Sequence, residues 1–220
     1  MTLLIAHRGA SAVAPENTIR AFRTAAELGA DWVELDVHLT DDRVLAVHHD
    51  YDVPGLGPIA ERAFAALPPH VPTLPAVLDA CGSMGVNVEV KSDTDHPASD
   101  AFLEAVVDAC RAWGGTVLVS SFDPRVVDAL QGQLPTAQLT LLPEHPPAET
   151  AAWIANRGHE AWHPWAKVVD EAVVEAAHAA GLLVNTWTVD DPDRIRELAA
   201  WGVDGIVTND VALCRGILDA

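Results

Sequence analysis

The fold is decided near the start of the chain, where the sequence reads Leu3-Leu4-Ile5-Ala6-His7-Arg8-Gly9 and then Pro15-Glu16-Asn17-Thr18. A short apolar run ends in His-Arg-Gly and is followed at once by residues that favour the start of a helix. This pattern predicts a parallel strand that delivers His7 and Arg8 to its C-terminal end. In α/β folds, that end of the sheet carries the functional groups.

The same strand-then-helix pattern continues along the chain. The predicted strands span residues 3–7, 32–39, 87–91, 116–120, 138–142, 161–163, 183–187 and 205–208. The predicted helices span residues 17–28, 75–84, 98–113, 124–130, 148–156, 170–180 and 192–200, and a last helix ends the chain. Eight such β-then-α units indicate an α/β fold, a compact TIM (β/α)8 barrel formed by a single domain over residues 1–220.

Two segments fall outside the regular alternation. Residues 44–48 are expected to extend the second strand after a turn at Asp41-Asp42. Residues 51–72 are rich in Pro and Gly and form the one long irregular stretch, which we interpret as a lid, as a reduced insertion or as an ordinary connecting loop.

Composition excludes several classes of protein. Half of the 220 residues are hydrophobic, so the chain is neither disordered nor fibrous. A net charge of -19 argues against partners such as nucleic acid or an anionic membrane surface.

The three cysteines, Cys81, Cys110 and Cys214, are widely spaced and are expected to be free thiols. The first residues lack the features of a signal peptide, and no apolar run reaches the length of a membrane helix, so we expect a cytoplasmic protein without stable membrane association.

Carboxylates on neighbouring predicted strands indicate a metal site. Glu34 and Asp36 are two positions apart and therefore share one face of their strand, and Glu89 lies on the next strand. Carboxylates that point into a barrel are costly unless a partner compensates for their burial. Hard divalent cations such as Ca²⁺ and Mg²⁺ prefer oxygen ligands. The alternative interpretation is a structural ion pair with Arg8 or Lys91.

Two histidines are candidates for proton transfer, because imidazole titrates near neutral pH. His7 ends the first strand, and His49 follows residues 44–48 and precedes Asp50. His48 and His49 face opposite sides if the strand pattern holds, and we favour His49. The other histidines, such as His70, His96, His145 and His178, are interpreted as structural or surface groups.

Further side chains are candidates for binding a substrate. Arg8 can hold a phosphate through two hydrogen bonds, and Lys91 can act as a point charge. Trp187 is interpreted equally as a core residue, as an apolar wall, or as a cation–π surface for a choline-like head group. Phe122 is a similar candidate. Pro15, Glu16 and Asn17 are interpreted as structural, with Asn17 or Thr18 as the N-cap of the first helix. The alternative is that this helix start faces the site and helps to hold Arg8 and its loop in place.

Together these motifs resemble the glycerophosphodiester phosphodiesterase family, a group of phosphatidylinositol-phospholipase-C-like TIM-barrel phosphodiesterases. The resemblance runs along nearly the whole chain. It rests on His7-Arg8-Gly9, Pro15-Glu16-Asn17-Thr18, Glu34-x-Asp36, His49-Asp50, Pro72-Thr73-Leu74, Glu89-x-Lys91, Ser121-Phe122, Trp187-Thr188-Val189 and Gly202-Val203-Asp204-Gly205-Ile206-Val207-Thr208-Asn209. One departure is the short segment of residues 51–57, where many members carry a larger insertion.

The resemblance implies metal-dependent cleavage of glycerophosphodiesters, such as glycerophosphocholine and glycerophosphoethanolamine, to glycerol 3-phosphate and an alcohol. It implies one divalent cation, Ca²⁺ or Mg²⁺, held by Glu34, Asp36 and Glu89. It also implies His7 and His49 as the acid–base pair and Arg8 and Lys91 as phosphate contacts.

Several alternatives stay open at this point. The attacking group is either water or a neighbouring glycerol hydroxyl that forms a cyclic phosphate, and either histidine is the base. Rival functions are a phospholipase D-like or lyase-type relative acting on lysophospholipids, a non-catalytic glycerophosphodiester-binding protein, and a TIM barrel of unrelated chemistry.

Overall fold

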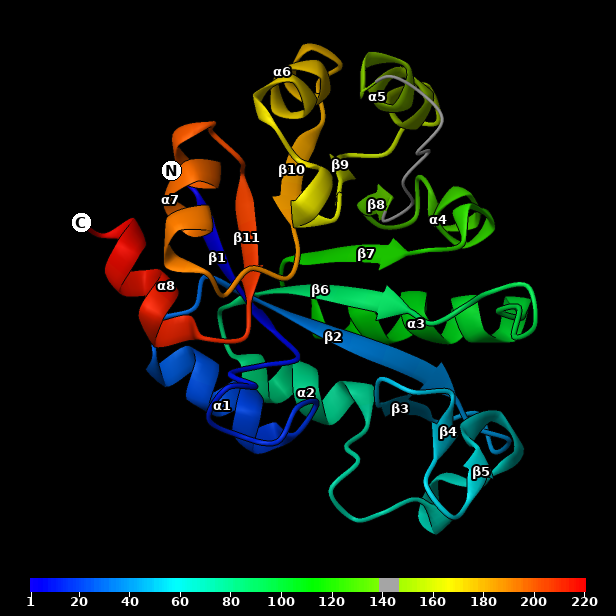
Figure 1. The fold of residues 1–220 in the computed structure, drawn as a ribbon. Coiled ribbons are helices and arrows are strands. Elements are labelled where there is room, and N and C mark those ends of the chain that lie inside the picture. Colours follow the sequence, from blue (N-terminus) through cyan, green and yellow to red (C-terminus); the bar gives the residue numbers. More distant parts are fainter. Residues whose placement is uncertain (139–146) are drawn as a thin grey trace.

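The computed structural model describes residues 1–138 and 147–220, and these form a closed parallel barrel (Figure 1). Its eight strands are β1 (Leu3–His7), β2 (Trp32–Leu39), β6 (Gly85–Val90), β7 (Val117–Ser121), β8 (Thr136–Gln138), β9 (Ala161–Trp162), β10 (Leu183–Thr186) and β11 (Gly205–Thr208). Neighbours pair in the order β1-β11-β10-β9-β8-β7-β6-β2, and β2 pairs again with β1, which closes the sheet. The predicted TIM barrel is therefore confirmed.

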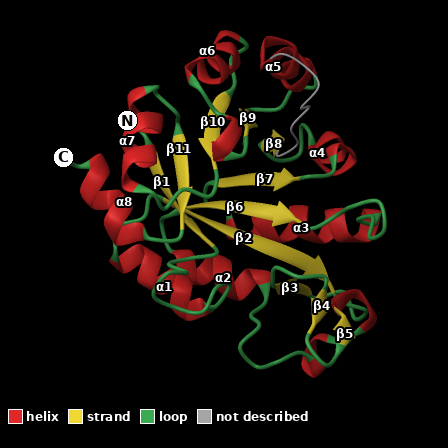
Figure 2. Ribbon diagram, viewed as in Figure 1, coloured by secondary structure: helices red, strands yellow, loops and turns green. Residues whose placement is uncertain are grey.

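One helix follows each barrel strand, and the helices form the outer layer (Figure 2). They are α1 (Ile19–Glu27), α2 (Leu74–Cys81), α3 (Asp100–Trp113), α4 (Pro124–Leu130), α5 (Pro147–Asn156), α6 (Glu171–Ala179), α7 (Pro192–Ala200) and α8 (Val211–Leu218). Every helix except α5 is preceded by a Thr, Ser or Asp whose side-chain oxygen accepts a hydrogen bond from the first turn. Such caps satisfy backbone N–H groups that have no partner within the helix. For α1 the cap is Thr18.

Successive residues of a barrel strand point alternately toward the surrounding helices and into the barrel. On β2, Val33, Leu35 and Val37 are buried in the main apolar core, which also contains residues of the surrounding helices. Glu34 and Asp36 alternate with them and therefore point into the barrel. In parallel sheets that are covered by helices, this alternation decides which residues reach the functional face.

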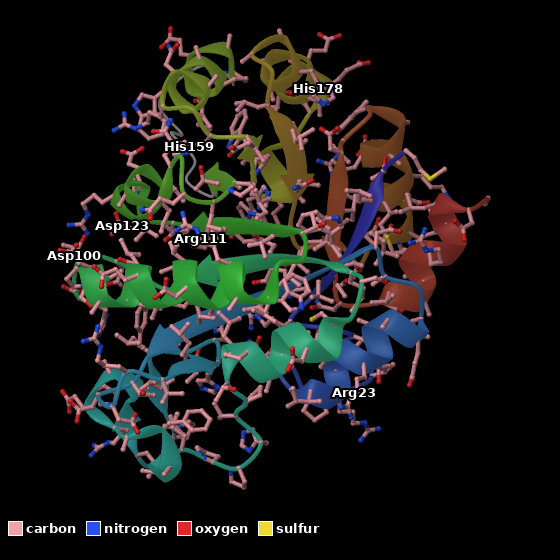
Figure 3. All side chains as sticks on the ribbon, turned by 180° about the vertical axis from the view of Figure 1, so that it is seen from behind. Arg23, Asp100, Arg111, Asp123, His159 and His178 are labelled. Carbon is pink, nitrogen blue, oxygen red and sulfur yellow. The ribbon has the colours of Figure 1, made fainter. Side chains whose placement is uncertain are left out.

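The helix layer presents charged side chains to its surroundings, including Arg23 of α1 and Arg111 of α3 (Figure 3). His178 of α6, also visible there, has its Nε2 atom 2.8 Å from Asp204 Oδ2. The histidine on this outer surface thus contacts a carboxylate at the N-terminal ends of the strands, away from the C-terminal ends. In the described part of the chain, no helix has both the length and the apolar character needed to cross a bilayer.

The strand predicted at residues 138–142 is placed differently. The structure has β8 at Thr136–Gln138, and the rest of the predicted strand, like His145, lies outside the described residues. Thr136 and Ala137 pair with Val119 and Ser120 of β7, and Ala137 pairs with Ala161 of β9. These pairings on both sides set the strand two residues earlier than the apolar run suggested.

Residues 44–48 do not extend β2. They contain β3 (Leu45–Val47), which runs antiparallel to β2. The chain reverses at Arg43, whose φ of 62° is in the left-handed region, and Thr40 Oγ1 accepts from the Val44 N–H 2.9 Å away. The turn at Asp41-Asp42 therefore closes a hairpin.

The segment of residues 51–72 is not the irregular stretch that its Pro and Gly content predicts, but contains short regular elements. It contains the short hairpin of β4 (Asp52–Val53) and β5 (Gly57–Pro58), followed by two 3-10 turns at Ile59–Glu61 and Phe64–Ala66. Its buried apolar side chains Val53, Ile59, Leu67 and Val71 form a small core together with Ala46 of β3. The three cysteines are buried and unpaired, as the sequence predicts.

Candidate active site

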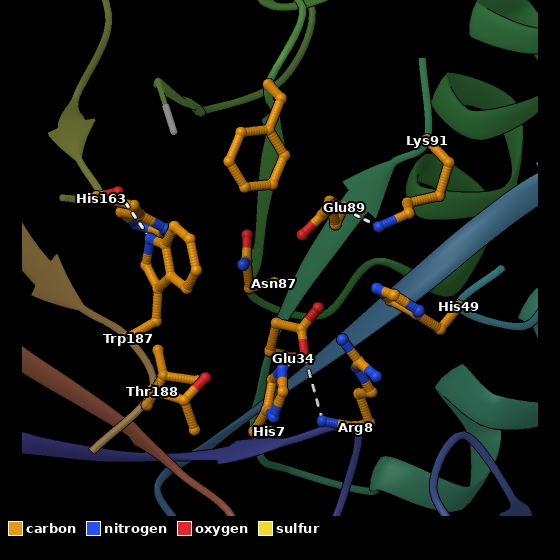
Figure 4. Close-up of a pocket in the computed structure, with 12 residues that line it drawn as sticks. His7, Arg8, Glu34, His49, Asn87, Glu89, Lys91, His163, Trp187 and Thr188 are labelled. Carbon is orange, nitrogen blue, oxygen red and sulfur yellow. Dashed lines mark hydrogen bonds and ion pairs between the residues drawn. The ribbon is translucent and has the colours of Figure 1, made fainter. Parts of the chain in front are cut away.

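The C-terminal ends of the barrel strands surround one pocket, which encloses about 560 Å³ including the part open to solvent. Figure 4 shows the lining side chains converging from separate strands. They are His7, Arg8, Glu34, His49, Asn87, Glu89, Lys91, Phe122, His163, Trp187, Thr188 and Val207. All the residues predicted for the site from the sequence, apart from Asp36, line this pocket directly.

Three buried carboxylates form a cluster beside the pocket. Glu34, Asp36 and Glu89 each offer an oxygen within 4.8 Å of the others. Burial, together with the charges of Asp36 and Glu89, raises the pKa of Glu34 well above its ordinary value. Burial, reinforced by Asp36, raises the pKa of Glu89 to about 7. The cluster therefore concentrates negative charge that calls for a positive partner.

Asp36 does not line the pocket itself, and it forms ion pairs with two cationic side chains that do. Its Oδ1 is 3.2 Å from Lys91 Nζ and its Oδ2 is 3.3 Å from Arg8 Nε. Lys91 Nζ also donates to Glu89 Oε1 at 2.8 Å. Burial alone would raise the pKa of Asp36, but Lys91 and Arg8 outweigh that effect and hold it below its ordinary value. The ion pairs that the sequence allowed as an alternative thus exist within the carboxylate cluster.

The backbone around Arg8 adopts an uncommon conformation. Arg8 has a φ of 56°, and the next residue, Gly9, has a φ of 81°. A side chain at Gly9 would meet the backbone of Ala21 in α1, so only glycine fits there. This turn directs the Arg8 N–H to Glu34 Oε2 at 3.0 Å and the guanidinium to Glu16 Oε1 at 3.0 Å. Glu16 therefore contacts a site residue and is not merely part of the helix start.

Asn17 was interpreted from the sequence as structural, yet it contacts the carboxylate cluster. Its Nδ2 donates to Asp36 Oδ2 at 2.8 Å, and its φ of 54° is again in the left-handed region. A non-glycine residue with positive φ is uncommon and is often found at functional positions. Asn17 thus fixes the orientation of Asp36 from the start of the first helix.

The two candidate histidines lie on the pocket with different partners. His7 Nδ1 is 2.7 Å from Asn209 Oδ1, and His7 Nε2 is 3.9 Å from Glu34 Oε2. Burial and the neighbouring Arg8 lower the pKa of His7. His49 Nδ1 is 2.7 Å from Asp50 Oδ1, and the Nε2 atom of the buried His38 lies 3.3 Å from the His49 carbonyl oxygen. His48 does not line the pocket, which agrees with the preference for His49.

Hydrogen-bonded polar groups near the C-terminus hold the His7 ring in place. Asn209 Oδ1 also accepts from Ser11 Oγ at 2.8 Å, and Asn209 Nδ2 donates to Asp190 Oδ2 at 2.6 Å. Asp190 Oδ1 accepts from the Asn209 N–H and from Thr208 Oγ1, both at 2.8 Å. The sequence shows the motif around Asn209 but not its role, because spacing alone does not bring residues 7 and 209 together.

Aromatic side chains form one wall of the pocket. Trp187 follows β10 and packs edge-on against Phe122, with ring centroids 5.6 Å apart. Trp187 Nε1 donates to the carbonyl oxygen of His163 at 2.8 Å, which fixes the indole ring. Both rings line the pocket, so Trp187 is a wall of the pocket and not a core residue.

Sequence reasoning missed two polar residues deeper in the pocket, Asn87 and His163. Burial lowers the pKa of His163 to about 3. A usable signal was present for Asn87, because Asn87 and Glu89 are two positions apart and share a face of β6. His163 was seen only as the end of a short predicted strand.

Both a family model and individual relatives match this chain over most of its length. The model of the Glycerophosphoryl diester phosphodiesterase family matches residues 7–63 and 55–213. A glycerophosphodiester phosphodiesterase from Caldanaerobacter subterraneus subsp. tengcongensis is 32% identical over 234 residues, which cover 95% of this chain and 94% of that protein.

Solved structures share the fold over nearly the entire chain. The structure of a glycerophosphodiester phosphodiesterase from Parabacteroides distasonis is 26% identical with a TM-score of 0.84, and the match covers 99% of this chain and 97% of that one. The structure of an Oleispira antarctica phosphodiesterase in complex with the product sn-glycerol-3-phosphate has a TM-score of 0.88 and covers 100% of this chain and 98% of that one. At 24% identity, this second likeness shows the fold alone. The family resemblance drawn from the motifs is confirmed, and the chain belongs to the glycerophosphoryl diester phosphodiesterase family of enzymes.

Proposed function

We propose that this enzyme hydrolyses glycerophosphodiesters, such as glycerophosphocholine and glycerophosphoethanolamine, to sn-glycerol 3-phosphate and an alcohol. The observation that carries the proposal is the meeting of the three-carboxylate cluster with His7, His49, Arg8 and Lys91 at one pocket. The product named for the Oleispira antarctica relative supports the same chemistry for a protein of this fold.

The carboxylate cluster fits a single divalent cation, Ca²⁺ or Mg²⁺. Glu34, Asp36 and Glu89 supply only oxygen ligands, which hard cations prefer. The raised pKa values of Glu34 and Glu89 also reflect negative charge that a cation would neutralise. When bound, the cation supplies Lewis-acid stabilisation of charge on the phosphate oxygens.

His7 is suited to act as the general base. Asn209 Nδ2 donates to Asp190, so the Oδ1 of Asn209 faces His7 as an acceptor. The His7 ring must then carry its proton on Nδ1, which leaves the lone pair of Nε2 on the side of Glu34. A neutral ring with a free Nε2 can take a proton from the attacking oxygen.

His49 is suited to act as the general acid. Its Nδ1 lies against the carboxylate of Asp50, so a doubly protonated ring keeps a charged partner at that position. It lines the same pocket as His7 from a different segment of the chain (Figure 4), and it can donate a proton to the leaving alkoxide. Arg8 and Lys91 add fixed positive charge beside the pocket, where negative charge grows in the transition state.

The test is the release of glycerol 3-phosphate from glycerophosphocholine and glycerophosphoethanolamine. Enzyme is treated with EDTA and then given Mg²⁺ or Ca²⁺, and Glu34→Ala is compared with Glu104→Ala, an exposed residue of α3. We expect release that depends on the cation, is lost in Glu34→Ala and is kept in Glu104→Ala. If the final product were a cyclic phosphate, the enzyme would catalyse a lyase reaction and not hydrolysis. Binding of substrate without any product would identify a non-catalytic binding protein.

A further inference from the structure

A second cavity adjoins the candidate active site and encloses about 760 Å³ including the part open to solvent. Its wall comes from the end of β2, from residues 51–60 and from residues 96–102, and the short hairpin of β4 and β5 lies beside it at the end of β2 (Figure 1). The polar side chains on this wall are His38, Thr40, Tyr51, Lys91, His96 and Ser99. We call this cavity the side pocket.

Strand alternation places the side pocket next to the carboxylate cluster. His38 follows Asp36 by two positions on β2, and Lys91 follows Glu89 by two positions at the end of β6. Asp36 pairs with Glu89 in the register of the two strands, so His38 and Lys91 come together one layer nearer the C-terminal ends. Lys91 lines both the side pocket and the candidate active site, and it therefore borders both cavities.

Packed rings fix the wall of the side pocket. Tyr51 stacks on His96 with ring centroids 4.2 Å apart, and its ring centroid is 5.2 Å from that of His38 with the two planes at 72°. The Tyr51 hydroxyl is also hydrogen-bonded to Asp93. One face of the tyrosine ring is thus covered by an imidazole, so the side pocket lacks the open aromatic cage that recognises quaternary ammonium groups.

The wall of the side pocket carries no carboxylate. Of the described residues that line it, none is Asp or Glu, and Lys91 contributes a positive charge. This absence stands out in a chain with 32 acidic and 13 basic residues. A cationic group such as choline would therefore meet a like charge there with no opposite charge on the wall to offset it.

The polar groups of the side pocket include both donors and acceptors. The carbonyl oxygen of His49 can only accept, so His38 holds its proton on Nε2 and keeps Nδ1 as an acceptor. Ser99 Oγ accepts from the Phe102 N–H at 3.3 Å, which leaves its own hydroxyl hydrogen able to donate. Hydroxyl groups both donate and accept, so an uncharged alcohol with several hydroxyl groups matches this wall.

We propose that the side pocket binds the alcohol portion of the substrate and selects uncharged, polyhydroxylated head groups, such as inositol, over cationic ones, such as choline. The inference rests on the proposed function and deepens it. Lys91 is a proposed phosphate contact that borders both cavities, so a phosphodiester held there can extend one of its two ester arms into the side pocket. Residues 51–60 then contribute to the choice of substrate.

The test compares two substrates that share the glycerol 3-phosphate portion and differ only in the head group. The kcat/KM values of glycerophosphoinositol and glycerophosphocholine are measured in excess Mg²⁺ or Ca²⁺ from the release of glycerol 3-phosphate. We expect the unmodified chain to favour the inositol ester by about tenfold or more.

A charge placed on the wall should change this preference. Ala60 is exposed and lines the side pocket. We expect Ala60→Glu to lower the inositol-to-choline ratio at least about threefold, because a nearby carboxylate attracts the cation, and Ala60→Lys to raise it by a similar factor. Ala65→Glu is the matched control, since Ala65 is an exposed residue of the second 3-10 turn, outside the side pocket, and should keep the ratio. The intrinsic difference in reactivity between the two esters cancels in these comparisons.

The outcomes separate this inference from the proposed function. A ratio at or below unity in the unmodified chain, or a ratio that is the same in Ala60→Glu, would overturn the side pocket as the head-group site and leave the phosphodiesterase activity standing. If neither substrate released glycerol 3-phosphate, both would be overturned. Thermal unfolding identifies a variant that fails to fold, and the unmodified chain and the remaining variant then still decide the question.

Discussion

The Nδ1 atom of His7 lies 2.7 Å from Oδ1 of Asn209, a residue 202 positions later in the sequence. Parallel pairing of β1 with β11 joins the two ends of the barrel, so the last strand can orient a side chain on the first. Asn209 in turn is held by Asp190. The proton on His7 is thus directed by residues that follow the last two strands.

Replacing Asn209 is expected to lower kcat much more than it changes KM. In Asn209→Leu the His7 ring loses the acceptor that fixes its tautomer, and we expect kcat to fall about 10²–10³-fold, within the range of lost acid–base catalysis. Asn209→Gln keeps both an acceptor oxygen for His7 and an N–H donor for Asp190, and it should recover part of the activity. Steady-state kinetics on glycerophosphocholine measure both. Equal losses in the two variants would show that Asn209 is needed only for folding.

The roles of the two histidines can be separated by the leaving group. A good leaving group such as 4-nitrophenol departs without protonation, so it bypasses a general acid but not a general base. We therefore expect His49→Ala to lose about 10²–10⁴-fold with glycerophosphocholine and much less with glycerol 3-phosphate 4-nitrophenyl ester. His7→Ala should lose activity to a similar extent with both substrates. The reverse pattern would exchange the two assignments.

Asn17 should control the affinity for the divalent cation without being a ligand. Its amide orients Asp36, and loss of such a supporting contact typically weakens metal binding by about 10–100-fold. We expect this loss in Asn17→Ala and also in Asn17→Gly, which tolerates the positive φ but lacks the amide. Calorimetric titration with Mg²⁺ measures it. If Asn17→Gly bound the cation like the unmodified chain, backbone strain rather than the hydrogen bond would explain the role of Asn17.

Thermal unfolding gives a test of the carboxylate cluster that is independent of turnover. A cation at about 100 times its dissociation constant stabilises the folded state by about 2.7 kcal/mol, which corresponds to a rise in Tm on the order of 5–10 °C for a chain of this size. We expect this rise in the unmodified chain and in Glu104→Gln, and its loss in Glu34→Gln and Glu89→Gln. A rise of equal size in Glu34→Gln would place the cation elsewhere.

The barrel and most of its site were predictable because they depend on local periodicity. Alternating apolar residues on β2 fix which side chains point inward, and the strand ends gather them. This is why Glu34, Glu89 and His7 could be placed from their positions alone. By the same rule Asn87 could have been found.

Two kinds of feature could not be predicted from the sequence. These are contacts between residues far apart in the chain and residues with a positive φ. The pairing of His7 with Asn209 needs barrel closure, and the role of Asn17 depends on a φ of 54° that no periodicity indicates. The hairpin of β2 with β3 was missed because its turn contains Arg43 at positive φ, where a glycine or asparagine would have given the signal. The contacts of His7 and Asn17 lie at the site, as expected where function rather than folding selects the residue.

The neutral, buried histidines predict how stability depends on pH. Burial lowers the pKa of His163 to about 3 and that of His38 to about 4, whereas both have values of about 6.5 in the unfolded chain. Below that value the unfolded chain binds protons that the folded chain does not, so acidification favours unfolding. Each histidine should lower the free energy of unfolding by about 1.4 kcal/mol per pH unit, for His163 down to about pH 3 and for His38 down to about pH 4. The raised pKa values of Glu34 and Glu89 act in the opposite direction in the metal-free protein, because the folded chain then binds the extra protons.

The contribution of His163 is isolated by comparison with His163→Gln. Urea unfolding of both proteins at intervals from pH 7 to pH 4 gives the difference in their free energies of unfolding. We expect the unmodified chain to lose stability relative to the variant as the pH falls, with a slope that approaches about 1.4 kcal/mol per unit below pH 5.5. The shared effect of the carboxylates cancels in the difference. Parallel curves would show that His163 takes up a proton in the folded protein and would contradict its buried, neutral state.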